Sequence, residues 1–212
     1  MFAVTSAVAA LVTANQVTQV AGASPISEPV FSNAVARDRS APLATLAAQS
    51  RATKQTASPL AAERGPLPSG SDQFGGDAAR QATGATALVG PTIQNFEGAA
   101  SQDNFNVFGF RVNPPDPNGE VGPNHYVEMV NLTFSIYSKT GTALVPPTAL
   151  GALWAGFAVD DCTDPSGDPV VLYDQFMDRW LLSQFTTRGP EYFNCVAISA
   201  TSDPTGAYYR YA

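Results

Sequence analysis

The stretch Leu132-Thr-Phe-Ser-Ile-Tyr137 alternates apolar and small polar residues, so Leu132, Phe134 and Ile136 would share one face of a strand. Similar short runs recur after residue 100 and are separated by Gly, Pro and Asp turns, which is typical of an all-β chain. The sequence therefore predicts an all-β fold built as an antiparallel meander. The expected strands are residues 88–96, 105–112, 125–130, 132–137, 170–173, 179–185, 192–199 and 207–211.

One helix is expected within this β-rich region. Thr148 can act as the N-cap of a short helix that continues through Leu150, Leu153 and Trp154. The last predicted strand ends at Ala212, where it would leave an unpaired apolar edge. We therefore expect the natural protein to continue beyond this residue.

Charge and aromatic content divide the chain near residue 100. Residues 1–100 hold six acidic and six basic side chains, so the whole net charge of −7 falls in the second half. Seventeen of the 21 aromatic residues also lie beyond residue 100, which places the core there. An acidic folded half without a Lys/Arg cluster argues against nucleic acid as a partner. No apolar run is long enough for a membrane span.

The N-terminal part has the composition of a leader and a linker. Residues 2–14 are apolar and are followed by Ala21-Gly22-Ala23, which predicts a secretory signal peptide over residues 1–23. An Ala-rich disordered N-terminus is the alternative, because no Lys or Arg precedes the apolar run. Residues 24–87 are rich in Ala, Ser and Pro, and we interpret them as a disordered linker or propeptide. Residues 88–212 form the expected β-rich region.

Cys162 and Cys195 are the only cysteines. In an exported acidic β-domain such a pair is most simply a disulfide, and two buried free thiols in a cytosolic protein are the alternative. A disulfide would attach the aspartate-rich loop around Cys162 to the sheet. Two cysteines and one histidine exclude a self-contained zinc site of the common Cys/His types.

Four aspartates cluster around Cys162. Clustered carboxylates repel one another, and Ca²⁺ is the cation suited to oxygen ligands in extracellular loops, so calcium is the candidate cofactor. The alternative is a solvated turn in which the Asp side chains accept backbone N–H groups. The candidate calcium ligands are Asp160, Asp161, Asp164 and Asp168.

Several other residues were weighed as sites. Asp116, Asn118 and Glu120 form a second cation candidate, with a hairpin turn as the alternative, and the lone His125 is interpreted as structural. Glu128 is a candidate glycosidase carboxylate with Asp174 or Asp178 as its partner. The aromatic residues Tyr208, Tyr209 and Tyr211 are candidates for stacking on sugar rings, with core packing as the alternative.

Three stretches carry a resemblance to known proteins: residues 118–131, residues 167–184 with Gly-Asp-Pro, Tyr-Asp and Arg-Trp, and residues 195–211 with Ser-Asp-Pro-Thr-Gly. They resemble an uncharacterised family of large secreted bacterial proteins with sialidase-like β-propeller repeats. The resemblance implies four-stranded propeller blades and a secreted or cell-surface location. The sialidase aspartate box is not matched, so the resemblance assigns no catalytic residue.

Two functions follow as hypotheses. The first is an exported or cell-surface propeller-like module that binds carbohydrate or an extracellular protein without catalysis. The second is the N-terminal blades of a secreted, sialidase-like glycoside hydrolase.

Overall fold

The computed structural model describes residues 32–52, 92–164 and 167–212. The predicted signal peptide and residues 88–91 of the strand predicted at 88–96 lie outside these ranges, as do residues 24–31 and 53–87 of the predicted linker. Residues 92–96, the described part of that predicted strand, are not a strand. Residues 34–212 form one compact unit, and the description that follows concerns this unit.

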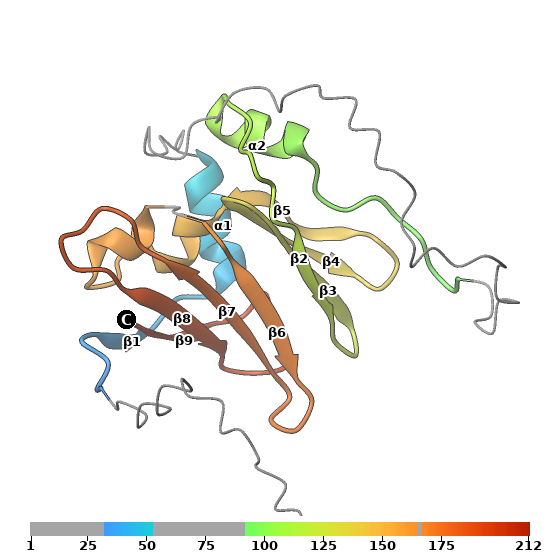
Figure 1. The fold of residues 1–212 in the computed structure, drawn as a ribbon. Helices are drawn as coiled ribbons and strands as arrows, with labels where there is room; N and C mark the ends of the chain where they lie inside the picture. Colours follow the sequence, from blue (N-terminus) through green and yellow to red (C-terminus); the bar gives the residue numbers. More distant parts are fainter. Residues whose placement is uncertain (1–31, 53–91, 165–166) are drawn as a thin grey trace, which may run out of the picture. The chain divides into compact units, whose positions relative to one another are not determined.

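The unit contains two antiparallel sheets, in which β2 to β5 and β6 to β9 pair in chain order (Figure 1). The first sheet contains β2 (Asn118–Val121), β3 (His125–Val130), β4 (Thr133–Ser138) and β5 (Ala143–Ala149), in that order. The second contains β6 (Val170–Asp174), β7 (Arg179–Phe185), β8 (Asn194–Ser199) and β9 (Tyr208–Tyr211). The antiparallel meander is thus confirmed within each sheet, and the described residues do not make a closed propeller.

The N-terminal residues add to the second sheet. β1 (Arg37–Arg39) pairs with β9, and α1 (Leu43–Ala52) follows it. The interpretation of residues 37–52 as linker is therefore wrong. The physical reason is that buried Leu43, Leu46, Ala47 and Ser50 recur at helical spacing, and Leu43 and Ala47 pack into the core. The Tyr208 N–H also donates to the Ser40 hydroxyl at 2.9 Å.

One hydrophobic core contains residues of both sheets. The side chains of one face of each sheet alternate into it, as the period of two requires. A hydrogen bond of 2.6 Å from the Val171 N–H to Asn118 Oδ1 also joins β6 to β2. The largest fully buried core residues of the two sheets are Val127, Met129, Phe134, Ile136, Val145, Val171, Trp180, Leu182 and Tyr208.

Residues 105–112 are not a strand. They overlap α2 (Ser101–Phe108), in which the Asp103 carboxylate accepts the Ala100 N–H at 2.7 Å and Gly109 ends the helix in a left-handed conformation. Asn104 and Phe108 are buried four residues apart, so the aromatic alternation that suggested a strand is overridden by helical packing.

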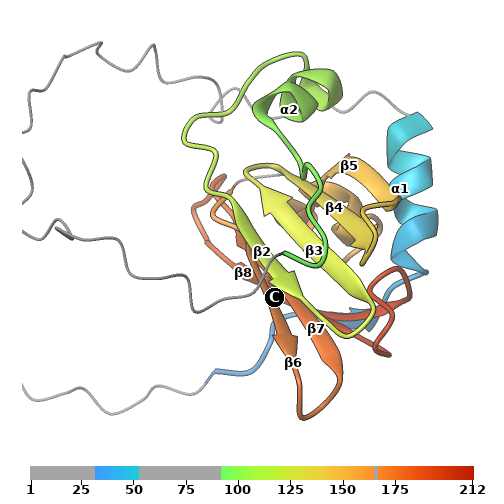
Figure 2. The same cartoon turned by 90° about the vertical axis from the view of Figure 1, so that its right-hand side faces the viewer.

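The helix predicted at residues 148–155 is a 3-10 helix, η2 (Leu150–Trp154). Thr148 is not its N-cap but belongs to β5, where its hydroxyl donates to the Pro146 carbonyl at 2.7 Å. A second 3-10 helix, η3 (Asp160–Thr163), precedes β6. Figure 2 shows the extended segment 92–100 crossing in front of β2 and β3 before it enters α2.

Candidate functional site

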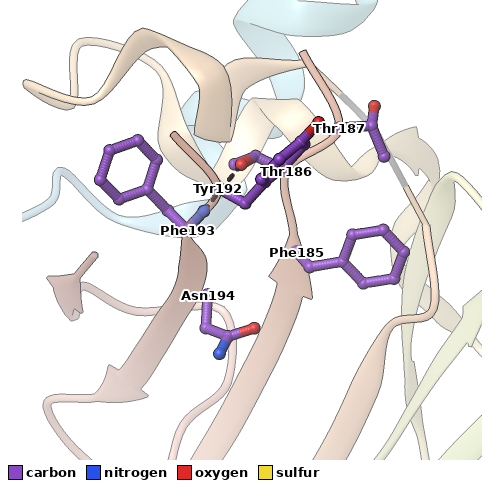
Figure 3. A pocket seen from close by; sticks show the side chains of 6 residues that line it. All are labelled: Phe185, Thr186, Thr187, Tyr192, Phe193 and Asn194. Carbon is purple, nitrogen blue, oxygen red and sulfur yellow. Dashed lines mark hydrogen bonds between the residues drawn. The ribbon is translucent and has the colours of Figure 1, made fainter. Parts of the chain in front are cut away.

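An open groove lies where β7 ends and β8 begins. Its volume is about 420 Å³, and Figure 3 shows the six side chains around it. None of them is acidic or basic. The groove, which we call the Tyr192 groove, is lined by Phe185, Thr186, Thr187, Tyr192, Phe193 and Asn194.

The two strands hold the ends of the groove in register. Phe185 and Asn194 are directly opposite one another at the end of the β7–β8 ladder. Beyond them, the Thr186 N–H donates to the Phe193 carbonyl and the Phe193 N–H donates to Thr186 Oγ1, both at 2.9 Å (Figure 3). These two bonds extend the β7–β8 hairpin by one residue pair, which fixes the backbone that carries Phe185 and Phe193.

Tyr192 is the exposed aromatic residue of the groove, at 70% of its full accessibility. Its ring lies over Gly189, where a Cβ atom would come within 2.8 Å of the Tyr192 hydroxyl oxygen. Gly189 also has a φ of +56°, which is in the left-handed region that favours glycine. Glycine is therefore needed here both for the backbone turn and for the position of the tyrosine ring.

A disulfide joins Cys162 of η3 to Cys195 of β8, as predicted. Both residues are fully buried. The Gln184 side-chain amide donates to the Cys162 carbonyl at 2.7 Å, so β7 holds the same loop. The bond fixes η3 to β8 at the residue directly after Asn194 of the groove.

Three of the four predicted calcium ligands form ion pairs with Arg188. The Arg188 guanidinium lies 2.6 Å from Asp161, 3.2 Å from Asp160 and 3.7 Å from Asp164. The guanidinium of Arg188, in the β7–β8 loop, thus offsets the repulsion between these carboxylates that suggested a bound cation. Asp168 is exposed at the start of β6 and takes no part in these ion pairs.

The arrangement of His, Cys, Asp and Glu side chains elsewhere agrees with this. Within residues 32–52, 92–164 and 167–212, no group of three or more His, Cys, Asp or Glu side chains is arranged to hold a metal ion. The calcium interpretation of the aspartate loop therefore gains no support. The Arg188 contacts account for three of the aspartates without it.

The second cation candidate consists of turn and strand residues. Asp116 accepts a hydrogen bond of 2.9 Å from the Asn131 amide, and Asn118 accepts the Val171 N–H. Glu120 accepts the N–H of its own neighbour, Val121, at 3.0 Å. These side chains satisfy backbone and amide groups, but the hairpin turn that was the alternative is wrong, because Asn118 and Glu120 belong to β2.

The three carboxylates of the predicted pair each accept a hydrogen bond from a neighbouring group. Glu128 lies on β3 and accepts the Ala99 N–H at 2.6 Å. Asp174 is the last residue of β6 and accepts the Phe176 N–H at 2.8 Å, while Asp178 of the β6–β7 turn accepts the Tyr173 hydroxyl. None of the contacts described for Glu128 involves either aspartate.

The remaining candidates take structural positions. Tyr208 is fully buried, its hydroxyl donates to the Pro204 carbonyl at 2.9 Å, and burial raises its pKa above the usual value. Tyr209 is 44% exposed under the Arg39 guanidinium, and Tyr211 pairs with Arg37 of β1. His125 begins β3, where its carbonyl accepts the Gly122 N–H at 3.0 Å.

Sequence reasoning missed the Tyr192 groove. The sequence places Tyr192 at the start of a strand over residues 192–199, whereas β8 begins at Asn194. The signal that could have found it is the loop Thr186-Thr-Arg-Gly-Pro-Glu-Tyr192, where a Gly-Pro break places a tyrosine outside either strand.

Comparisons with known protein families, with curated proteins and with solved structures found no match. None of the helices described has the length and apolar character that crossing a membrane requires.

Proposed function

We propose that this chain is an exported, non-enzymatic module that binds neutral carbohydrate in the Tyr192 groove. The observation that carries the proposal is the exposed Tyr192 ring, which stands in an open groove whose six described lining residues carry no charge. Ligand sites are concave and mostly apolar, with a few placed polar groups.

The chemistry of the groove suits a sugar ring. The C–H face of a pyranose packs against an aromatic face, and Tyr192 offers such a face to solvent. Asn194 is exposed beside it, and its amide can both donate to and accept from sugar hydroxyls. A neutral ligand fits best, because a charged one would find no opposite charge in the lining.

Export is supported by the disulfide. Structural disulfides form and persist in oxidising compartments and are rare in cytosolic proteins. Cys162 and Cys195 are paired and fully buried, which fits a structural bond. A secreted or cell-surface location is the compartment in which this bond would last.

The propeller architecture is proposed from the order of the strands. Strands β2 to β5 form one four-stranded meander and β6 to β9 form another, to which β1 adds at the β9 edge. The first strands of the two meanders, β2 and β6, lie next to one another as the inner strands of neighbouring blades do. The outer face of the second sheet is also apolar, which suits packing against a further sheet. Its residues are Val170, Leu172, Leu181, Val196, Ile198, Tyr209 and Tyr211.

Catalysis is not part of the proposal. Glycoside hydrolysis commonly uses two carboxyl groups on either side of the scissile bond. The described lining of the Tyr192 groove contains no carboxylate, and Glu128 lies outside it and accepts the Ala99 N–H.

The test is a glycan array probed with the full 212-residue chain, run beside a panel of chromogenic glycosides. The matched variants are Tyr192→Ala and Phe176→Ala, because Phe176 is 99% exposed in the β6–β7 turn and does not line the groove. We expect binding to neutral glycans, a loss of about tenfold or more in Tyr192→Ala, and no change in Phe176→Ala.

Three results would contradict the proposal. They are no array binding by the wild type, unchanged binding in Tyr192→Ala, or turnover of a glycoside without array binding. The last would favour the hydrolase hypothesis instead.

A further inference from the structure

A second groove lies on the opposite side of the first sheet from the core. Its volume is about 650 Å³, and it is lined on one side by the extended segment around Phe96 and on the other by β2 and β3. We call it the Glu128 groove. The residues on which the argument depends are Ile93, Phe96, Val121, Tyr126, Glu128 and Lys139.

The strand period explains why these residues meet. Tyr126 and Glu128 are two residues apart on β3 and so share a face, and Val121 of β2 is directly opposite Tyr126. The neighbouring core residues Val127 and Met129 point to the other face. The groove is therefore the outward face of the first sheet.

An aromatic cluster holds the segment that forms the other wall. The Phe96 ring centroid lies 6.1 Å from that of Tyr126 and 5.6 Å from that of Tyr137. Edge and tilted contacts of this kind are favourable between aromatic rings. Phe96 thus keeps the segment at residues 93–98 beside the sheet.

Glu128 is held in place as a carboxylate acceptor. It accepts the Ala99 N–H at 2.6 Å. Burial, followed by the charge of Glu128 and a hydrogen bond with it, raises the pKa of the Tyr126 hydroxyl to about 12, so the phenol stays protonated at neutral pH. A carboxylate has about four acceptor positions, so Glu128 keeps capacity for a ligand.

Lys139 supplies the opposite charge. Its ammonium donates to the Gly122 carbonyl at 2.8 Å, which fixes the end of a flexible side chain. An ammonium has three donors, so this bond leaves two of them for a ligand. Lys139 itself is exposed.

The two charges line one groove without neutralising one another. The ion pairs of the described residues join Arg188 to three aspartates and Arg210 to Asp38, and none joins Lys139 to Glu128. An acid and a base that line the same groove and make different backbone contacts suit a ligand that carries both charges. Beside them, Ile93 is 93% and Val121 53% exposed, which leaves apolar surface uncovered.

We propose that the Glu128 groove binds a free amino acid with an apolar side chain. The α-ammonium of the ligand faces Glu128, its α-carboxylate faces Lys139, and its side chain covers Ile93 and Val121. This site is separate from the Tyr192 groove and does not depend on carbohydrate binding.

The experiment is calorimetric titration of the full chain with three probes at pH 6.5, where α-amino groups are protonated. L-Leucine carries both charges, L-leucinamide lacks the carboxylate, and N-acetyl-L-leucine lacks the ammonium. We expect leucine to bind and each analogue to bind at least tenfold more weakly. No leucine binding at millimolar concentration, or equal binding of all three probes, would overturn the proposal.

Variants assign the carboxylate contact to Lys139. We expect Lys139→Gln to weaken leucine binding about tenfold while leaving leucinamide unchanged, because leucinamide has no carboxylate to lose. Lys139→Arg should restore leucine binding, and Tyr192→Ala should leave it unaffected. Unchanged leucine affinity in Lys139→Gln, with the circular dichroism spectrum preserved, would refute the assignment.

Discussion

Removal of the Cys162–Cys195 disulfide should destabilise the fold strongly. The two cysteines are 33 residues apart, and loop-closure entropy for that length is worth about 3.7 kcal/mol at 25 °C. A domain of this size has a free energy of unfolding of about 5–15 kcal/mol, so the bond supplies a large share. The melting temperature should fall by roughly 7–15 °C.

Urea unfolding measures this effect in three samples. These are the oxidised wild type, the wild type with dithiothreitol throughout, and the double variant Cys162→Ala/Cys195→Ala. The reduced wild type isolates the cross-link, because it changes no side chain. The double variant should be equally or slightly less stable, since both sites are fully buried and alanine leaves small cavities.

The slope of the unfolding free energy against urea gives a second readout. Without the cross-link the unfolded chain exposes more surface, so the slope should rise in both the reduced protein and the double variant. A difference below about 1 kcal/mol between oxidised and reduced wild type would refute the account in which this bond constrains the unfolded chain.

Three further predictions concern single side chains. Gly189→Ala should lower the free energy of unfolding in urea by about 1 kcal/mol and should also weaken glycan binding. Gly156 is the control, because it has a φ of +73° and no described atom lies within 4 Å of its added Cβ. Gly156→Ala should lower the free energy of unfolding by a similar amount and leave binding unchanged. Asp38→Asn should lower the free energy of unfolding by about 1–3 kcal/mol, because the buried Arg210 guanidinium loses its carboxylate partner and keeps only two carbonyl acceptors. An unchanged midpoint of urea unfolding would contradict this. The pKa of Tyr126 in the folded protein lies above its unfolded value of 10, so the stabilisation from its protonated phenol is present below pH 10 and is lost as the pH rises through about 12. The fall in the free energy of unfolding over this pH range should be smaller in Tyr126→Phe. Ultraviolet titration of the tyrosinates checks the folded pKa.

The strands that could be predicted are those with a local signal. His125–Val130 and Arg179–Phe185 alternate between core and outward positions, and the observed strands have these bounds. The disulfide was also predictable, because only two cysteines were present to form it. In these cases the side-chain period or the composition alone carries the information.

The elements that were missed depend on distant partners. β1 is Arg-Asp-Arg, with no apolar residue, and it is a strand because it pairs with β9 about 170 residues later. The buried positions of α1 do follow a helical period, but its Ala-rich surroundings led us to interpret it as linker. α2 was misread because the aromatic residues Phe105 and Phe108 suggested alternation, while Asp103 and Gly109 marked helix ends.

The candidate sites show the same limit. The aspartate cluster was visible in sequence, but its cation is Arg188, 24 or more residues away in another loop. The Tyr192 groove depends on how Gly189 turns the chain beneath a tyrosine ring, which residue spacing does not reveal.

The most direct measurement of the central claim is a ¹H–¹⁵N amide titration of the chain with the neutral saccharide that gives the strongest array signal. The account predicts saturable shifts gathered at the amides of Thr187, Tyr192 and Asn194, with the Glu128 groove undisturbed. Shifts centred elsewhere, or none at saturating sugar, would contradict it.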